Sequence, residues 1–406
     1  MMRVPLRPKN IKIHKPKIRA PKRVVRKPEI IVGIPTYNEA DNIEALVKTI
    51  DAGLRKYFPD KKALIIISDS NSPDGTRRIF LNTRTKTPKK CVESPRGKGN
   101  ALKIIFEYFL SKDSAQVLML IDGDVTSVTK KWVRNLITPI LKGFDHCLPL
   151  YKRNEYDSAV TDHVVYPILR GVLGIDIRQA LGADVGLSRK AVDRIYNRKW
   201  PSKASRYGID IFMTLSSVFG ELRIAQADLG VKEHRLSDEP HAVFYETVTT
   251  LFELLEENKH FWSGKLRVRK PPLFFKSSGV KPSIPIFNID YKNLRTTGMS
   301  EYKKYRPSIK RIVGSKESEH LGKIFKKGSR ASIDTKEWMD IMFSFVKASN
   351  IPASRRAKLI HPLFMDRFLT VYKKYLDKDN RMLENEIVRQ AEMFYKERKS
   401  LIAKKN

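Results

Sequence analysis

The sequence has few cysteines and no long apolar run. Only Cys91 and Cys147 occur among its 406 residues, without a CxxC pair or a Cys/His cluster. Two cysteines cannot build a disulfide framework, so we expect a reducing, cytoplasmic setting. No stretch approaches 18 uninterrupted apolar residues, and the basic N-terminal residues alternate with prolines instead of leading into an apolar signal core. We therefore expect neither a membrane-spanning helix nor a secretory signal.

Acidic residues are scarce at both ends of the chain, although the formal net charge is +35. Residues 1–28 contain 11 Lys or Arg and no acid, and residues 265–406 contain 34 basic against 14 acidic residues. Residues 29–264 are nearly neutral, with 34 basic and 30 acidic residues. We expect a disordered basic arm over 1–28, a catalytic domain over 29–264, and a basic, Pro-rich connector followed by a helical extension with a small core of its own over 265–406.

Short apolar runs alternate with helical patterns in the neutral region. Residues 30–34, 63–67 and 117–121 form runs that suit strands buried on both faces. Apolar stripes at helical spacing lie over residues 43–54, 102–110 and 132–140, and another lies over 383–394. This order predicts an α/β fold with an open, mostly parallel sheet flanked by helices, whose ligands bind beyond the carboxyl ends of the strands.

Polar motifs follow each of the three predicted strands. The third strand runs into Asp122-Gly123-Asp124, where two carboxylates could hold a hard divalent cation against a diphosphate and the glycine would let phosphate approach. The first strand leads into Pro-Thr-Tyr-Asn-Glu (35–39) and the second into Asp-Ser-Asn-Ser-Pro-Asp-Gly (69–75). Arg-Gly-Lys-Gly-Asn (96–100) opens a helix, where a cation could grip phosphate. Taken singly, these motifs could equally be strand-ending or basic turns.

In this order the motifs resemble those of the GT-A glycosyltransferases. Four further segments look like mannosylglycerate and glucosyl-3-phosphoglycerate synthases: Asp-Val-Thr-Ser (124–127), Gly-Ala-Asp (182–184), Tyr-Gly-Ile-Asp (207–210) and Leu-Gly-Val-Lys-Glu-His-Arg (229–235). That resemblance implies a GT-A fold and a retaining enzyme that glycosylates a three-carbon acid. The likeness extends through about residue 240.

The resemblance also implies roles for single residues on the donor side. A nucleotide-sugar donor would contact the side chains and backbone of Pro35, Tyr37, Glu39, Asp69, Lys98, Asp122 and Gly123. Mg²⁺ or Mn²⁺ would be held by Asp122, Asp124 and His234, and the imidazole favours Mn²⁺. Catalysis would rest on Asp210, Asp124 and Lys98, with Asp210 as an electrostatic group rather than a nucleophile.

For the acceptor, the resemblance implies contacts from Arg153, Asp157, Thr161, Gly182, Asp184 and Asp210. Arg153 would clamp a carboxylate bidentately, and Asp157 and Thr161 would take hydroxyl groups. Ala159 stands where the phosphoglycerate enzymes have an Arg, so glycerate and phosphoglycerate both stay open as acceptors. We therefore expect a metal-dependent transfer of a hexose from a UDP-glucose or GDP-mannose type of donor to a small hydroxy acid.

Two alternatives stay open at this point. Transfer to a polyprenyl phosphate at a membrane surface would use the same donor motifs, and the basic flanks could then hold the protein on anionic lipid. A nucleic-acid-binding protein with a degenerate transferase domain is a third interpretation, which the lack of aromatic residues in the basic arm disfavours. The helical extension could also provide a contact between copies of the chain.

Overall fold

The computed structural model describes residues 27–152, 158–235, 239–264, 266–276, 290–326, 331–376, 378 and 380–402. Within them a single eight-stranded sheet has the order β3-β2-β1-β4-β6-β5-β7-β8. Its strands are β1 Ile30–Thr36, β2 Ala63–Asp69, β3 Lys89–Glu93, β4 Val117–Leu120, β5 His146–Lys152, β6 Val185–Ser188, β7 Ile224–Val231 and β8 Leu273–Phe274. Only β6 runs antiparallel to its neighbours among these strands. The predicted open, mostly parallel sheet is confirmed.

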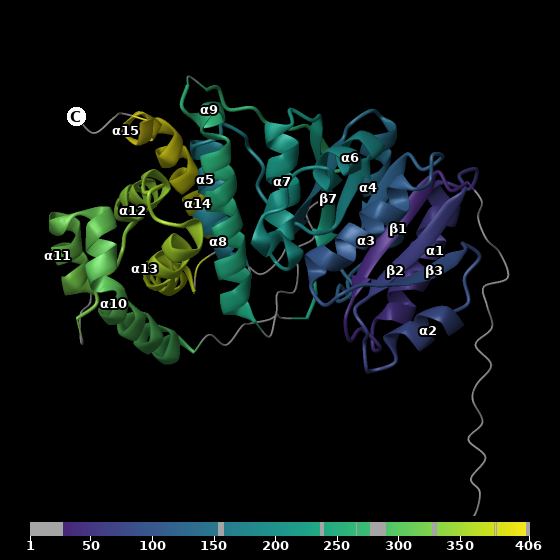
Figure 1. Ribbon diagram of the computed structural model, residues 1–406, viewed down its shortest axis with the longest axis horizontal. Coiled ribbons are helices and arrows are strands. Elements are labelled where there is room, and N and C mark those ends of the chain that lie inside the picture. Colours follow the sequence, from purple (N-terminus) through teal and green to yellow (C-terminus); the bar gives the residue numbers. More distant parts are fainter. Residues whose placement is uncertain are drawn as a thin grey trace, which may run out of the picture.

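Helices cover both faces of the sheet (Figure 1). Those of the sheet domain are α1 Ile43–Tyr57, α2 Thr76–Asn82, α3 Lys98–Leu110, α4 Lys130–Leu141, α5 Tyr166–Gly171, α6 Arg189–Tyr196, α7 Ile209–Phe219, α8 Pro240–Glu257 and α9 Lys259–Trp262. Two short turns are wound differently, the π-helical η1 Thr161–Val165 and the 3₁₀ turn η2 Ser202–Ser205. The apolar stripes predicted over 43–54, 102–110 and 132–140 become the buried faces of α1, α3 and α4.

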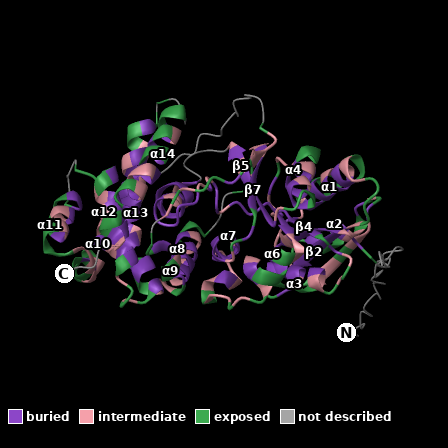
Figure 2. Ribbon diagram, turned by 90° about the horizontal axis from the view of Figure 1, so that it is seen from above, coloured by how far each residue is buried: buried purple, intermediate pink, exposed green. Residues whose placement is uncertain are grey.

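The C-terminal region is helical, as predicted. It consists of α10 Tyr291–Val313, α11 Ser315–Ile324, α12 Thr335–Lys347, α13 Ala353–Tyr375, α14 Asn380–Lys396 and α15 Arg398–Ile402. These helices lie on the side of α5 and α8 that faces away from α1 and α2 (Figure 1), and their inner faces are buried (Figure 2). Helix α13 packs against α8, and α14 packs against α5. No helix among the described residues is long and apolar enough to cross a membrane.

The hydrophobic core of the C-terminal helices differs from the expected separate one. Buried residues such as Trp338, Phe345 and Leu363 belong to the same contiguous cluster as Ile31 and Leu118 of the sheet. A second cluster fills the opposite face of the sheet, beneath α1 and α4. The helical extension therefore shares one core with the sheet domain, so the two regions hold each other's position.

Candidate active site

The three polar motifs predicted at strand ends meet at one edge of the sheet. Strands β2, β1 and β4 are neighbours, and the register pairs Thr36 with Asp69 at their carboxyl ends. The backbone N–H of Ile121 donates to Gly33 O, so Asp122 emerges just beyond this edge. A cavity of about 530 Å³ opens there, at the place where parallel sheets bind ligands.

A lysine bridges two acids at the bottom of this cavity. Lys98 begins α3, and its Nζ lies 3.1 Å from Asp122 Oδ1 and 3.0 Å from Asp210 Oδ2. Burial opposes the charge of Lys98, but the two carboxylates outweigh burial, so the pKa of Lys98 lies above its ordinary value. Lys98 is therefore held as a cation between Asp122 and Asp210, which lie 24 and 112 residues from it along the chain.

Asp210 still has a free acceptor position. Its Oδ2 binds Lys98, whereas its buried Oδ1 has no hydrogen-bond partner among the described residues. Burial raises the pKa of Asp210 to about 6, and Asp122 adds to this effect while Lys98 opposes it. Since a buried polar atom without a partner is costly, Oδ1 is suited to accept a hydrogen bond from a ligand hydroxyl.

Asp124 and His234 are brought together by an isolated antiparallel bridge. Val125 pairs with His234, and the N–H of Thr126 donates to Glu233 O at 3.0 Å. This bridge places His234 Nδ1 3.8 Å from Asp124 Oδ2. Burial would raise the pKa of Asp124, but the proximity of His234 and the charges of nearby lysines outweigh it and lower that pKa.

The pair fits a divalent cation in part. Two ligand atoms that each lie about 2.1 Å from one metal ion are about 3 to 4 Å apart, which matches the Asp124–His234 distance. His234 Nδ1 also lies 2.8 Å from Arg235 O, so the ring would have to turn or use Nε2 to bind the metal. No group of three His, Cys, Asp or Glu side chains in the described ranges forms a ready-made metal site. Oxygens from a bound diphosphate or from water would have to complete the coordination.

Asp184 lies beneath the cavity rather than in it. It is fully buried, and its carboxylate accepts from the N–H of Asp122 at 3.0 Å, from Lys232 Nζ at 2.8 Å and from the Tyr151 hydroxyl. Asp184 therefore fixes the loop that carries Asp122, which does not agree with the expected direct contact to an acceptor. Gly182 is not among the cavity-lining residues either, and it packs so tightly that a Cβ there would meet the Pro149 ring.

Asp69 has a comparable supporting position. It is 2% exposed, and its two oxygens accept hydrogen bonds from the Thr36 hydroxyl at 3.0 Å, the Ser72 hydroxyl at 2.6 Å and the Ser72 N–H at 3.0 Å. Its neighbour along this edge, Glu39, does line the cavity. Burial raises the pKa of Glu39 to about 8, although Arg235 Nη2 donates to it at 2.8 Å and opposes the rise.

Of the remaining predicted residues, four line the cavity and two lie outside the described residues. Pro35, Tyr37, Gly123 and Thr161 line the cavity. Arg153 and Asp157 lie outside the described residues, so the predicted carboxylate clamp has no structural description.

Glycines in the two predicted phosphate motifs are needed for packing. A Cβ on Gly123 would lie 2.9 Å from Glu39 Cγ, and a Cβ on Gly99 would lie 1.7 Å from Ala204 O. The sequence predicted that Gly123 lets a phosphate approach closely, whereas in the structure residues 35–39 approach Gly123 closely. The glycine of the Asp-Gly-Asp motif thus lets its loop lie against the end of β1.

Several cavity residues were not predicted. Arg96 stacks over the Tyr37 ring at 3.8 Å, and Arg206 donates to Glu239 at 2.7 Å. Lys232 also lines the cavity and is held by Asp184. Arg96 begins a motif that was recognised, Lys232 lies within one and Arg206 directly precedes one, but no spacing in the sequence says that their side chains line the cavity.

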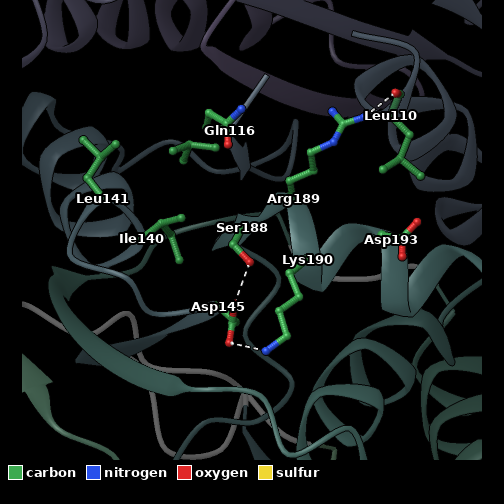
Figure 3. Close-up of a pocket in the computed structure, with 10 residues that line it drawn as sticks. Leu110, Gln116, Ile140, Leu141, Asp145, Ser188, Arg189, Lys190 and Asp193 are labelled. Carbon is green, nitrogen blue, oxygen red and sulfur yellow. Dashed lines mark hydrogen bonds and ion pairs between the residues drawn. The ribbon is translucent and has the colours of Figure 1, made fainter. Parts of the chain in front are cut away.

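A larger hollow of about 810 Å³ lies at the opposite end of the sheet (Figure 3). It is lined by residues near the start of β4 and the end of β6, and several of its polar side chains are bound to protein groups. Ser188 Oγ donates to Asp145 at 2.9 Å, and Arg189 donates to the carbonyl oxygen of Leu110 at 2.8 Å. The first cavity brings Lys98, Asp122, Asp124, Asp210 and His234 together, so we take it as the candidate site for chemistry.

Comparison with known proteins finds a family match that spans most of the residues of this cavity. Residues 66–244, which include Lys98, Asp122, Asp124, Asp210 and His234, match the family described as the GT domain of mannosylglycerate synthase. This region is a GT-A glycosyltransferase domain.

Single relatives are similar to parts of the GT-A domain. Mannosylglycerate synthase of Selaginella moellendorffii is 26% identical over 162 residues, which are 38% of this chain and 37% of the relative. Dolichol-phosphate mannosyltransferase of Pyrococcus furiosus is 29% identical over 117 residues, which are 29% of this chain and 31% of the relative. The chain thus spans about a third of the length of these two curated relatives.

A crystal structure of glucosyl-3-phosphoglycerate synthase from Mycobacterium tuberculosis, with Mn²⁺, UDP-glucose and phosphoglyceric acid, superimposes with a TM-score of 0.47. Its sequence identity is 26%, and the alignment covers 56% of this chain and 80% of that chain.

Proposed function

We propose that the protein is a metal-dependent, retaining glycosyltransferase that moves a hexose from a nucleotide sugar to glycerate, 3-phosphoglycerate or a similar small hydroxy acid. The observation that carries this proposal is the cavity in which Lys98 joins Asp122 to Asp210 while Asp124 faces His234. The match of residues 66–244 to the mannosylglycerate synthase domain supports the same acceptor class.

On the donor side, cations and hydrogen-bond acceptors are arranged for a nucleoside diphosphate. Tyr37, stacked beneath Arg96, offers a face for the base, and Glu39 can accept from base or ribose. Lys98 offers a permanent positive charge to the diphosphate. A divalent cation held by Asp124 and His234 would stabilise the charge that develops on the leaving diphosphate.

On the acceptor side, Asp210 is the group closest to the chemistry. Its unpartnered Oδ1 accepts a hydroxyl of the transferred sugar or of the acceptor, and its charge favours an oxocarbenium-like transition state. Thr161 lines the same cavity. We assign Asp184 and Asp69 to supporting positions, because both are buried and bound to protein groups.

Transfer to a polyprenyl phosphate is the second candidate. The observation that favours it is the likeness of part of the chain to a dolichol-phosphate mannosyltransferase. It would need the same donor residues and metal, and only the acceptor end of the cavity would differ.

An acceptor screen separates the two candidates. The protein is incubated with Mn²⁺ or Mg²⁺, UDP-glucose or GDP-mannose, and either glycerate, 3-phosphoglycerate or a polyprenyl phosphate in detergent. We expect free nucleoside diphosphate to be released with a three-carbon acid and the metal, and not by the Asp210→Asn variant. Release with the lipid phosphate alone would favour the second candidate, and no release with any pair would refute both.

A further inference from the structure

The turn that lines the acceptor end of the cavity is an unusual piece of helix. Ser158, Val160 and Thr161 contribute to the cavity wall, and the chain then continues as the π-helical η1 into α5. The N–H of Tyr166 bonds to Thr161 O, five residues back, as a π-turn requires. Such wide turns are less stable than α-helix, so this one needs support from its surroundings.

Pro167 removes a further hydrogen bond from this turn. An amide at position 167 would donate to the carbonyl of residue 163 in an α-helix or of residue 162 in a π-helix, but proline has no N–H. Trp338 Nε1 from α12 donates to His163 O at 2.6 Å, and Gln390 Nε2 from α14 donates to Asp162 O at 3.0 Å. Two side chains of the C-terminal helices thus satisfy the two carbonyls that Pro167 cannot reach.

An ion-pair relay makes a second connection between α14 and the turn. Glu384 binds Arg178 through two hydrogen bonds of 2.7 and 2.8 Å. Arg178 Nη1 in turn donates to Asp162 at 2.6 Å, and Asp162 accepts from the Ser158 hydroxyl at 2.5 Å. Asp162 is 1% exposed, so its charge depends on Arg178 for compensation. The relay ends on a residue of the cavity wall.

We infer that helices α12 and α14 belong to the acceptor site, with Trp338, Gln390 and Glu384 as positioning residues for Ser158 and Thr161. This inference rests on the proposed function for its kinetic consequence, but the contacts themselves do not depend on it. The C-terminal helices are therefore required to keep the acceptor end of the cavity in shape, whereas the donor end is built from β1, β4 and α3.

The chain offers a matched pair of variants to test the relay. Glu384 and Glu392 both lie on α14, and each binds an arginine of the sheet domain, since Glu392 accepts from Arg170 at 2.7 Å. Arg178 continues to Asp162, which binds Ser158 at the cavity wall. Arg170 continues to Asp176, at 3.0 Å, which accepts from the Tyr166 hydroxyl at the other end of the turn, away from the cavity-lining residues. Glu384→Gln should therefore loosen the turn, and Glu392→Gln should remove a similar ion pair without doing so.

Steady-state kinetics and hydrogen exchange can distinguish the Glu384→Gln variant from the Glu392→Gln variant. In Glu384→Gln we expect the acceptor KM, for glycerate or 3-phosphoglycerate, to rise roughly three- to tenfold, with kcat and the donor KM within about twofold. Backbone amides of residues 158–166 should exchange faster by a similar factor, measured by mass spectrometry. Glu392→Gln should match the unmodified protein in both. Equal effects of the two variants, or equal changes in donor and acceptor KM, would overturn the inference.

A rescue experiment tests the capping of the carbonyls. Trp338→Phe removes the N–H donor and should raise the acceptor KM and the exchange of residues 158–166. Adding Pro167→Ala supplies a backbone N–H within reach of His163 O, so it should bring both quantities back toward their original values. If Trp338→Phe acts only through its smaller ring, Pro167→Ala would not restore the acceptor KM or the exchange rates. Absence of rescue would therefore contradict the capping role of Trp338.

The exchange measurement also separates this inference from the proposed function. If no acceptor supports transfer, the proposed function fails, yet the difference between Glu384→Gln and Glu392→Gln in residues 158–166 still decides whether α14 positions the turn. Binding of UDP and GDP, measured by calorimetry, should be unchanged in all these variants.

Discussion

Replacing Asp210 by Asn should make the protein more stable and less active. Asp210 is held at its place by Lys98 Nζ at 3.0 Å, and an amide of the same shape keeps this contact while removing the charge. We expect kcat to fall by roughly 100-fold or more, because the carboxylate that stabilises the transition state is lost. The gain in stability follows from the pKa.

The raised pKa of Asp210 sets the size of the expected gain in unfolding free energy. Burial places the pKa of Asp210 at about 6 in the fold, against an ordinary value of 3.8. A difference of one in pKa corresponds to about 1.4 kcal/mol, so ionised Asp210 costs the fold roughly 3 kcal/mol at pH 7. Since the folded pKa is the higher one, the cost is absent below pH 3.8, grows between 3.8 and 6, and is complete above 6. At pH 5 it should be roughly half as large.

The assay is urea unfolding of both proteins in metal-free buffer at pH 7 and pH 5, followed by circular dichroism. We expect the Asp210→Asn variant to unfold at higher urea at pH 7, with a difference in unfolding free energy that shrinks at pH 5. A variant that is less stable at pH 7, or a difference that does not change with pH, would refute the argument that Asp210 is held ionised against its surroundings.

Three further predictions follow from other contacts. Asp124→Ala and His234→Ala should each lower metal-dependent turnover by roughly 100-fold or more while the protein still unfolds cooperatively in urea, and full activity in either variant would contradict the metal assignment. Gly99→Ala should destabilise the fold by more than about 3 kcal/mol, measured by urea unfolding, because its Cβ would overlap Ala204 O. Burial lowers the pKa of His146 to about 3, so stability should fall as pH drops below 6.5, by up to about 1.4 kcal/mol per pH unit. His146→Gln should make this fall shallower, and an unchanged slope would count against the assigned burial.

The strands and helices with strong patterns could be predicted from the sequence. Apolar runs identified β1, β2 and β4, and helical stripes identified α1, α3 and α4. Strand β3 escaped because its residues are partly exposed and two of them are lysines, as suits the edge of a sheet. Strand β8 has only two residues, which is too short for any pattern.

The site could be predicted where a residue directly follows a strand. Asp122 and Asp124 lie where their motif indicated, because the end of a parallel strand fixes the position of the next residues. Burial could not be predicted in the same way. Asp184 and Asp69 stand in motifs that resemble those of the family, but their side chains turn into the protein and bind it.

The contribution of the C-terminal helices was invisible in the sequence. Trp338 and Gln390 lie more than 170 residues from the carbonyls to which they donate. The sequences around Trp338 and Gln390 show only the pattern of an amphipathic helix. Nothing in the spacing of residues along the chain relates these two side chains to Pro167. Contacts of this kind depend on how two regions pack, and a single sequence gives no measure of that packing.

We expect Asp124 and His234 to hold a divalent cation together with a nucleoside diphosphate. Electron paramagnetic resonance of Mn²⁺ tests it most directly, because the signal distinguishes free from bound ion. We predict that the protein binds Mn²⁺ weakly by itself and much more tightly when UDP or GDP is added, and that Asp124→Ala and His234→Ala both abolish the tight binding. Tight binding that persists in both variants, or that ignores the nucleotide, would contradict the account.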